Sequence, residues 1–141
     1  MTATRQGLRI KASKIDPAIR SAFTKFAKWL RQRYSFPVRV PVYLHDKEFV
    51  ISKNKESCVS IFFAPYSNDV EPYIKIAVGD YSVLLSEHGR DEALFTLLYS
   101  MSVEVLKYQK WLVDNNGLDS YDATDDATEL LSEYVTFNDT P

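Results

Sequence analysis

Apolar residues recur at steps of three and four over residues 91–113, and no other feature of the sequence constrains the fold as strongly. An α-helix has 3.6 residues per turn, so this spacing gathers the apolar side chains on one face of a long helix. Those side chains are Leu94, Leu97, Leu98, Met101, Val105, Tyr108, Trp111 and Leu112. Gly117 is suited to a left-handed cap that ends the helix. The sequence therefore predicts a long helix with one buried face.

A second amphipathic helix is predicted near the amino terminus. Residues 7–12 alternate apolar and polar side chains, which is typical of a short strand. Asp16 and Pro17 then provide a cap and a first-turn proline for a helix over residues 17–34. Its apolar face comprises Ile19, Phe23, Phe26, Leu30 and Tyr34. Much of the remaining surface is basic, with Arg20, Lys25, Lys28, Arg31 and Arg33.

The middle of the chain predicts a small sheet. Residues 38–44, 57–64 and 73–78 combine alternation with β-branched and aromatic side chains. Pro41 indicates an edge strand or a bulge, because proline donates no hydrogen bond to a neighbouring strand. Asp80 is expected to cap a short helical turn over residues 81–85, which His88 and Gly89 close.

A last helix is predicted over residues 122–136, with Ala123, Ala127, Leu130, Leu131 and Tyr134 on its apolar face. The order of elements predicts an α+β fold: an N-terminal helix, a three- to four-stranded mixed sheet, a long helix and a C-terminal helix. The chain of 141 residues, 45% of them hydrophobic, suits a single domain over residues 1–141.

Composition excludes several classes of protein. The single cysteine, Cys58, excludes an internal disulfide framework. The longest apolar run, residues 61–64, is too short to cross a bilayer. The first 13 residues contain no apolar segment typical of a secretion signal. We therefore expect a cytoplasmic protein without a membrane partner.

Charge is unevenly distributed although the net charge is only −2. Residues 1–33 contain nine basic side chains and one acidic side chain, whereas residues 111–141 contain eight acidic side chains and no Lys or Arg. Such polarity can steer a polyanion to one end of a protein, or can let the two ends attract each other. Because the basic residues lie on an ordinary amphipathic helix, we favour either this mutual attraction or two separately solvated surfaces.

Glu104 lies between Met101 and Tyr108 on the apolar face of the long helix. A buried carboxylate needs a partner, and Lys107 and Tyr108 follow at the helical distances of three and four residues. One interpretation is a carboxylate satisfied by Lys107 or by a nearby hydroxyl at the edge of the core. The other is a carboxylate that faces a functional cleft.

Residues 95–112 resemble the active-site helix of small zincin metallopeptidases, the minimal gluzincin group, which has a His-Glu-x-x-His motif. Val103-Glu104-Val105-Leu106-Lys107 occupies the five motif positions. The resemblance implies that Glu104 stands at the position of the catalytic general base. It also implies that Val103 and Lys107 replace the two histidine ligands, and that Asp126 stands at the position of the third ligand. Asp125 and Glu129 are alternatives for that position.

The two replacements remove the chemistry that the motif supplies. Histidines at i and i+4 bind one zinc ion through two imidazole nitrogens, whereas valine offers no lone pair and a lysine offers a positive charge. We therefore expect no metal and no cofactor. Glu104 is left as a vestigial base, and the Lys107 ammonium is expected to replace the cation beside Glu104 and Asp126 or a neighbouring acid. This pairing should lower the pKa of the carboxylate.

The other candidate residues show no spacing that favours metal binding or catalysis. His45 and His88 are expected in surface loops, and Cys58 is expected to be a small buried apolar residue.

The leading hypothesis is a zincin-like domain without its metal that binds a peptide or protein partner in a cleft containing Glu104, Lys107, Val103, Tyr108 and Asp126. The alternatives are a nucleic-acid-associated protein that uses the basic N-terminal helix, and a residual metallopeptidase with a non-standard site. The sequence leaves the oligomeric state open.

Overall fold

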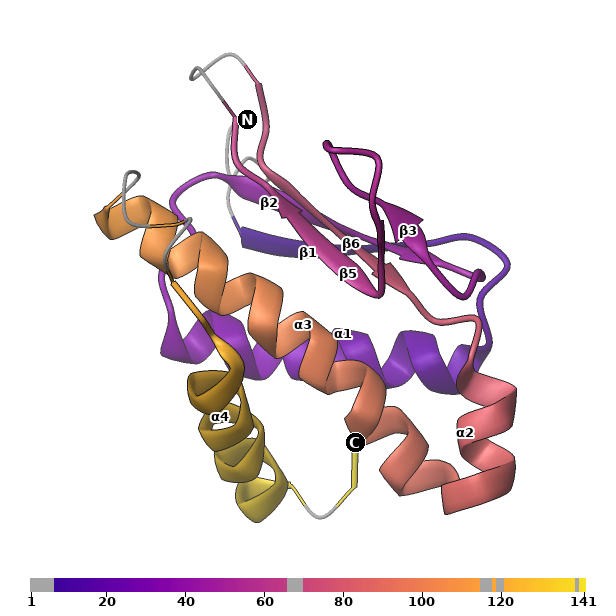
Figure 1. Cartoon of the computed structure of the whole chain (residues 1–141). Helices are drawn as coiled ribbons and strands as arrows, with labels where there is room; N and C mark the ends of the chain where they lie inside the picture. Colours follow the sequence, from indigo (N-terminus) through magenta and orange to yellow (C-terminus); the bar gives the residue numbers. More distant parts are fainter. Residues whose placement is uncertain (1–6, 66–69, 115–117, 119–120, 139) are drawn as a thin grey trace.

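A four-stranded mixed sheet with helices on one side forms the framework of the protein (Figure 1). The computed structural model describes residues 7–65, 70–114, 118, 121–138 and 140–141. The elements in chain order are β1 (Gly7–Ala12), α1 (Pro17–Arg33), β2 (Arg39–His45), β3 (Val50–Ile51), β4 (Ser57–Cys58), β5 (Ser60–Phe63), β6 (Tyr73–Ala77), α2 (Tyr81–His88), α3 (Arg90–Val113) and α4 (Thr124–Phe137). The predicted α+β class and small mixed sheet are confirmed.

The strands of the main sheet follow the order β1-β2-β6-β5. β1, β2 and β6 are parallel, and β5 pairs antiparallel with β6 at one edge. Parallel neighbours need a crossover connection, which α1 provides between β1 and β2. β3 and β4 form a separate antiparallel hairpin.

All four helices lie on the same side of the main sheet (Figure 1). α1 and α3 pack against the sheet, and α4 packs against α3. The core between these layers contains side chains from the strands and from α1, α2, α3 and α4, among them Val42, Ile74, Phe23, Leu98 and Tyr134. Within the described residues, no helix lies on the opposite face of the main sheet (Figure 1).

The predicted start and apolar face of α1 are confirmed. The Asp16 side chain accepts a hydrogen bond from the backbone N–H of Ala18, and Pro17 occupies the first turn. The helix ends at Arg33, one residue before the predicted end, because Tyr34 adopts an extended backbone.

The prediction of an edge position or bulge for Pro41 is wrong. β2 lies inside the sheet, paired with β1 on one side and with β6 on the other. Pairing with β6 begins at Val42, one residue after Pro41. The proline therefore lies where β2 is not yet paired with β6, so an interior strand accommodates it.

The single strand predicted over residues 57–64 is divided in the structure. Residues 57–58 pair with Val50–Ile51 in the hairpin, whereas residues 60–63 pair with β6. Val59 separates the two pieces and accepts a hydrogen bond from the backbone N–H of Ala77. Alternation predicted the strands but did not distinguish their two partners.

The later helices differ from the prediction mainly at their ends. α2 continues to His88 instead of residue 85, and Asp80 makes no side-chain cap. Gly89, with a φ angle of 87°, ends α2 and precedes α3, as a residue that tolerates positive φ can do. α3 ends at Val113 as predicted, whereas the predicted cap at Gly117 lies outside the described residues.

The two oppositely charged ends of the sequence meet in the fold. Arg33 of α1 forms an ion pair with Glu133 of α4, and the Lys25 ammonium donates a hydrogen bond to the backbone carbonyl of Thr140. At these contacts the structure supports attraction between the two ends.

Within the described residues, the structure contains no helix that is long and apolar enough to cross a membrane.

Candidate functional site

The carboxylate of Glu104 is buried on the sheet-facing side of α3. Only 2% of the residue is exposed, and its neighbours Met101 and Tyr108 are fully buried. The helical period explains this position, because Met101, Glu104 and Tyr108 follow one another at steps of three and four. The prediction that Glu104 lies on the buried face is confirmed.

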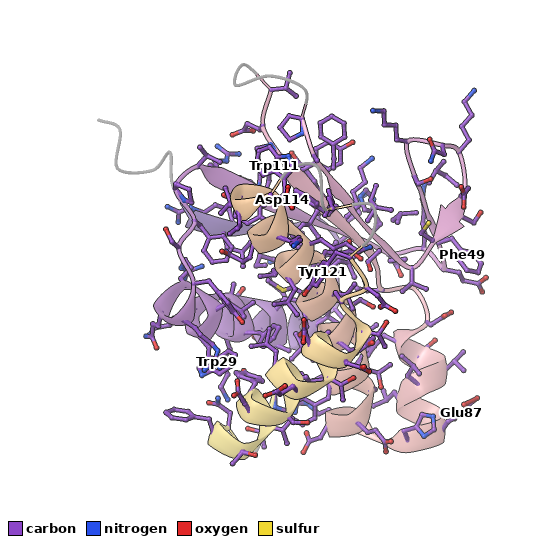
Figure 2. All side chains as sticks on the ribbon, turned by 60° about the vertical axis from the view of Figure 1, so that its left-hand side comes forward. Trp29, Phe49, Glu87, Trp111, Asp114 and Tyr121 are labelled. Atoms are coloured by element: carbon purple, nitrogen blue, oxygen red, sulfur yellow. The ribbon has the colours of Figure 1, made fainter. Side chains whose placement is uncertain are left out.

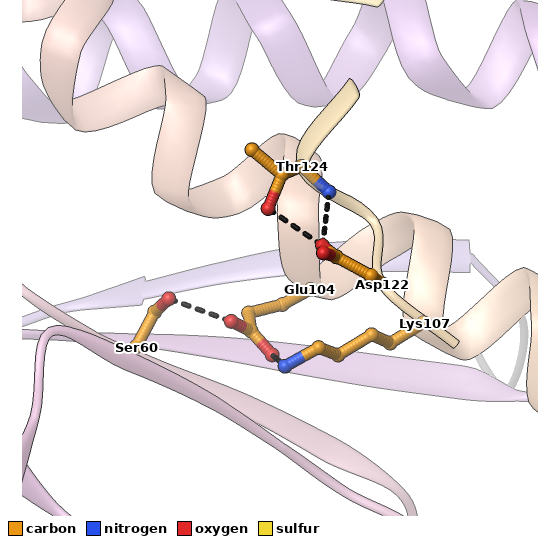
Figure 3. A network of polar contacts seen from close by, with 5 residues as sticks. All are labelled: Ser60, Glu104, Lys107, Asp122 and Thr124. Atoms are coloured by element: carbon orange, nitrogen blue, oxygen red, sulfur yellow. Dashed lines mark hydrogen bonds and ion pairs between the residues drawn. The ribbon is translucent and has the colours of Figure 1, made fainter. Parts of the chain in front are cut away.

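Two side chains hold the Glu104 carboxylate (Figure 3). The Ser60 hydroxyl of β5 donates a hydrogen bond of 2.7 Å to Oε2. The Lys107 ammonium lies 3.5 Å from Oε1, one turn further along α3. The three side chains form what we call the Glu104 cluster, which consists of Glu104, Lys107 and Ser60.

Lys107 was predicted as a partner of Glu104, whereas the nearby hydroxyl was not assigned to a residue and is that of Ser60. Alternation along residues 60–63 places Ser60 on the same face as Phe62, and Phe62 packs against the core. A hydroxyl at a core-facing strand position was the available signal. Only the pairing of β5 with β6 shows that this hydroxyl lies opposite Glu104.

Burial governs the protonation of Glu104. Removal from water raises the pKa of this carboxyl above its ordinary value, although the Lys107 charge and the Ser60 hydrogen bond act in the opposite direction. Pairing with Lys107 thus acts in the predicted direction, but the predicted lowered pKa is wrong because burial outweighs the pairing. The partners reduce the effect of burial without reversing it.

The second carboxylate near Lys107 is Asp122, which precedes α4 (Figure 3). Asp122 accepts hydrogen bonds from the backbone N–H of Thr124 at 2.9 Å and from its hydroxyl at 2.6 Å. These bonds lower the pKa of Asp122, and the charge of Lys107 contributes to the same shift. The predicted acid across the site was Asp126 or a neighbour; the Lys107 charge acts on Asp122, but it is the smallest of the causes that shift the pKa of Asp122.

Asp126 has other partners. It accepts a hydrogen bond of 3.0 Å from the Tyr121 hydroxyl, and it lines a pocket of about 280 Å³ with Glu129 and Arg33. Partial burial, followed by this hydrogen bond, raises the pKa of Tyr121 to about 12. Asp125, the other alternative, is exposed. Asp126 and Glu129 lie on α4 at a pocket shared with Arg33 of α1, and neither belongs to the Glu104 cluster.

Val103 and Tyr108 differ in exposure. Val103 is half-buried, four residues before Lys107 on the same helix. Tyr108 is fully buried, with its ring stacked on Phe36 at a centroid distance of 5.6 Å and edge-on to Phe62 at 5.9 Å. Tyr108 is therefore a core residue without surface for a ligand, and its predicted binding role is not supported by its position.

Metal-binding side chains are dispersed. Among the described residues, no three His, Cys, Asp or Glu side chains lie close enough to hold a metal ion. His88 ends α2 and is exposed, and Cys58 is half-buried in β4. His45 is the last residue of β2 rather than a loop residue, and its Nε2 atom is buried without a hydrogen-bond partner.

Comparison with known proteins adds no relative: no family model, no curated protein and no solved structure matches this chain.

Proposed function

We propose that the chain is a zincin-like domain without a metal site that binds an extended segment of a peptide or protein. The observation that carries this proposal is the closed Glu104 cluster. A carboxylate that activates water must reach that water, whereas Glu104 is 2% exposed and is held by Lys107 and Ser60. In this proposal the cluster joins α3 to the edge of the sheet and performs no hydrolysis.

Lys107 supports the loss of metal in a second way. Its ammonium occupies the polar space beside Glu104, and Asp122 adds a second negative charge near it. A cation at this position would be repelled by the ammonium. The lysine therefore performs the charge neutralisation that the resemblance assigns to a metal.

The edge strand β5 supports binding of an extended segment. Among the described strands, β5 pairs with β6 alone, and it packs against α3 on the same side as Ser60. Val59 directs its carbonyl toward β6, so alternation directs the backbone groups of Ser60 and Phe62 away from β6. A strand added at this edge would bond to these groups.

The two alternatives have less support. Four basic side chains of α1 already have partners within the protein. Arg20 donates a hydrogen bond to the carbonyl of Ala12, and Arg31 donates one to the carbonyl of Leu8. Lys25 donates a hydrogen bond to the carbonyl of Thr140, and Arg33 forms an ion pair with Glu133. This reduces the case for α1 as a nucleic-acid surface. No arrangement of the described residues favours a residual metallopeptidase.

Hydrogen exchange tests the binding proposal. Peptides selected from a random ten-residue display library should slow exchange of the amide protons of Ser60 and Phe62, which point away from β6. The amides of Ile61 and Phe63 are internal controls, because they face β6 and are protected in the free protein. If selected peptides slow exchange elsewhere and leave these two amides unchanged, the β5 edge is not the binding site.

The double variant Val103→His/Lys107→His tests the zincin resemblance. Both side chains lie on one helix four residues apart, and Asp122→Glu can supply a third ligand near them. The control is Thr24→His/Lys28→His on the exposed surface of α1, which provides the same spacing without a carboxylate across from it. We expect at least tenfold tighter zinc binding by the triple variant in calorimetry. Equal affinities would remove this support for the resemblance.

A further inference from the structure

The four strands of the main sheet contain basic residues and no acidic residue. Their charged side chains are Arg9, Lys11, Arg39 and Lys75, and His45 ends β2. This is unusual in a chain that contains 19 acidic and 17 basic residues. The main sheet is therefore a local region of positive charge in a protein whose net charge is negative.

These basic side chains lie on the face of the sheet that has no helix. The buried residues Leu8, Val40 and Ile74 mark the helix-facing side of three strands. Side chains alternate along a strand, so Arg9, Arg39 and Lys75 point the opposite way. We call this side the open face; it comprises Arg9, Lys11, Arg39, Tyr43, His45, Ile61, Phe63, Tyr73 and Lys75.

Aromatic rings lie between the cations on the open face. Phe63 stacks on Tyr73 at a centroid distance of 4.8 Å, and Tyr43 meets Tyr73 edge-on at 6.1 Å. The Lys75 ammonium lies 5.3 Å from the centre of the Tyr73 ring. The strand register also aligns Lys11, Tyr43 and Lys75 across three neighbouring strands. Positive charge and flat apolar surface thus alternate across the face.

A pocket of about 410 Å³ ends the open face where the β3–β4 hairpin meets the sheet. His45, Lys47 and Lys75 supply its polar wall, and Phe49 and Ile51 supply an apolar wall. Phe49 is 52% exposed and projects from the hairpin away from Trp29 and α1 (Figure 2). His45 lines this pocket, and its buried Nε2 atom forms no hydrogen bond with any other described residue.

Acidic groups lie at the margin of this surface. Glu71 precedes β6 and lies 3.7 Å from Arg39, while Asp46, Glu48 and Glu56 lie in connections. The acidic residues of α4 are on the helix side of the sheet (Figure 1). Lys11 and Lys75 of the open face therefore lie on the side of the sheet opposite to α4.

We propose that the open face binds single-stranded nucleic acid. The cations contact phosphates, Tyr43 and Tyr73 contact bases, and the pocket at His45 holds one base. Sheets bind single strands by combining a positively charged surface with aromatic rings that bases can reach, and Tyr43 and Tyr73 are half-buried on this face. An acidic peptide would pair with the cations of the open face but would leave the aromatic rings without stacking partners. A duplex would offer its phosphates, but its bases stay stacked inside and cannot contact the rings. This surface is separate from α1 and from the β5 edge.

Fluorescence anisotropy with labelled 20-nucleotide oligothymidylate and oligouridylate tests the proposal. Both single strands should bind, and the logarithm of the binding constant should fall against the logarithm of salt concentration with a slope of about −1.4 to −2.8 for two to four phosphate contacts. The 20-base-pair duplex and poly-glutamate are expected to bind at least tenfold more weakly. Comparison of the two binding constants shows whether the protein distinguishes deoxyribose from ribose.

Charge-reversal variants locate the site. Lys11→Glu/Lys75→Glu should weaken binding at least tenfold and reduce the salt slope. The control Lys28→Glu/Arg90→Glu makes the same change in net charge on the helix side and should change affinity less than threefold. Tyr43→Ser should weaken binding about fivefold or more without changing the salt slope, because it removes stacking and no charge.

The proposal is overturned by any of three results. These are no binding of either single strand at 50 mM salt, equal binding of poly-glutamate or duplex, and equal weakening by the control variant. Thermal unfolding must show that each variant is folded. If the double variant is not folded, the exposed single variant Lys11→Glu replaces it, with an expected loss of at least threefold against Lys28→Glu.

Discussion

The hydroxyl of Ser60 and the carboxylate of Glu104 form a 2.7 Å hydrogen bond that connects the edge strand β5 to the long helix α3. It joins residues 44 positions apart in sequence. The bond satisfies one oxygen of a nearly completely buried carboxylate, and the Lys107 ion pair supports the other. The position of β5 and the protonation of Glu104 on α3 are therefore coupled.

Ser60→Ala should destabilise the protein and raise the pKa of Glu104 further. The variant removes a hydrogen bond to a buried charged group, so we expect a loss of about 1–2 kcal/mol in the free energy of unfolding at neutral pH. Urea unfolding and carbon-13 titration of the Glu104 carboxyl measure the two effects. Ser132→Ala, at an exposed position of α4, should change stability by less than about 0.5 kcal/mol. An unchanged Glu104 pKa would show that the bond does not matter energetically.

Glu104→Gln should preserve or increase stability at neutral pH. In the unfolded chain this carboxyl ionises near its ordinary pKa, whereas burial raises its pKa in the folded protein. As pH rises between these two values the unfolded state releases its proton first, so the natural protein loses stability relative to the variant. The stability advantage of the Glu104→Gln variant should therefore be absent below the ordinary pKa of the carboxyl. It should grow as pH rises from this value to the raised pKa of the folded protein. Urea unfolding from pH 3 to 8 measures this difference in the free energy of unfolding, with Glu129→Gln at an exposed position as control. A Glu104→Gln variant that becomes less stable than the natural protein toward neutral pH would contradict this account.

Lys107→Ala should destabilise the protein most at neutral pH. The lysine side chain is 36% exposed, so solvent screens its charge and we expect a loss of about 1–2 kcal/mol. The loss should disappear in acid, where Glu104 is protonated and needs no cation. Adding Glu104→Gln should recover most of it, because the unpaired buried charge is then absent. Strictly additive effects in this double-mutant cycle would show that Lys107 is an ordinary surface lysine.

Gly79→Ala should disturb the start of the hairpin and its pocket. A Cβ atom at this position would lie 2.5 Å from the Lys47 backbone carbonyl carbon, so we expect a loss of about 1–3 kcal/mol. Gly89→Ala is the matched control: nothing lies within 4 Å of its added Cβ, and only its positive φ angle opposes alanine, at about 1 kcal/mol. Nuclear magnetic resonance should show a shift of the His45 imidazole signals in the first variant alone. Equal shifts in both would exclude a local effect at the pocket.

Residues that define local periodicity were predicted well, and residues that depend on a distant partner were not. The buried position of Glu104 and its pairing with Lys107 follow from spacing along one helix. Ser60 and Asp122 reach this site from other elements, so no local pattern identified them. The direction of the Glu104 pKa was predicted wrongly because a sequence shows the charged neighbour but not the extent of burial.

The sequence by itself determined the helices, most strands, the buried face of α3 and the uneven distribution of charge. These follow from short-range spacing, because an element repeats its side-chain directions every 3.6 or two residues. Only the tertiary structure decided that β2 lies inside the sheet despite Pro41. It also decided that the Lys107 charge acts on Asp122. Finally, it placed Arg9, Arg39 and Lys75 on one face of the sheet. Each of these depends on which strands and helices become neighbours. Neighbours are chosen by burial of the whole core, which combines contributions from every element and cannot be read from one segment.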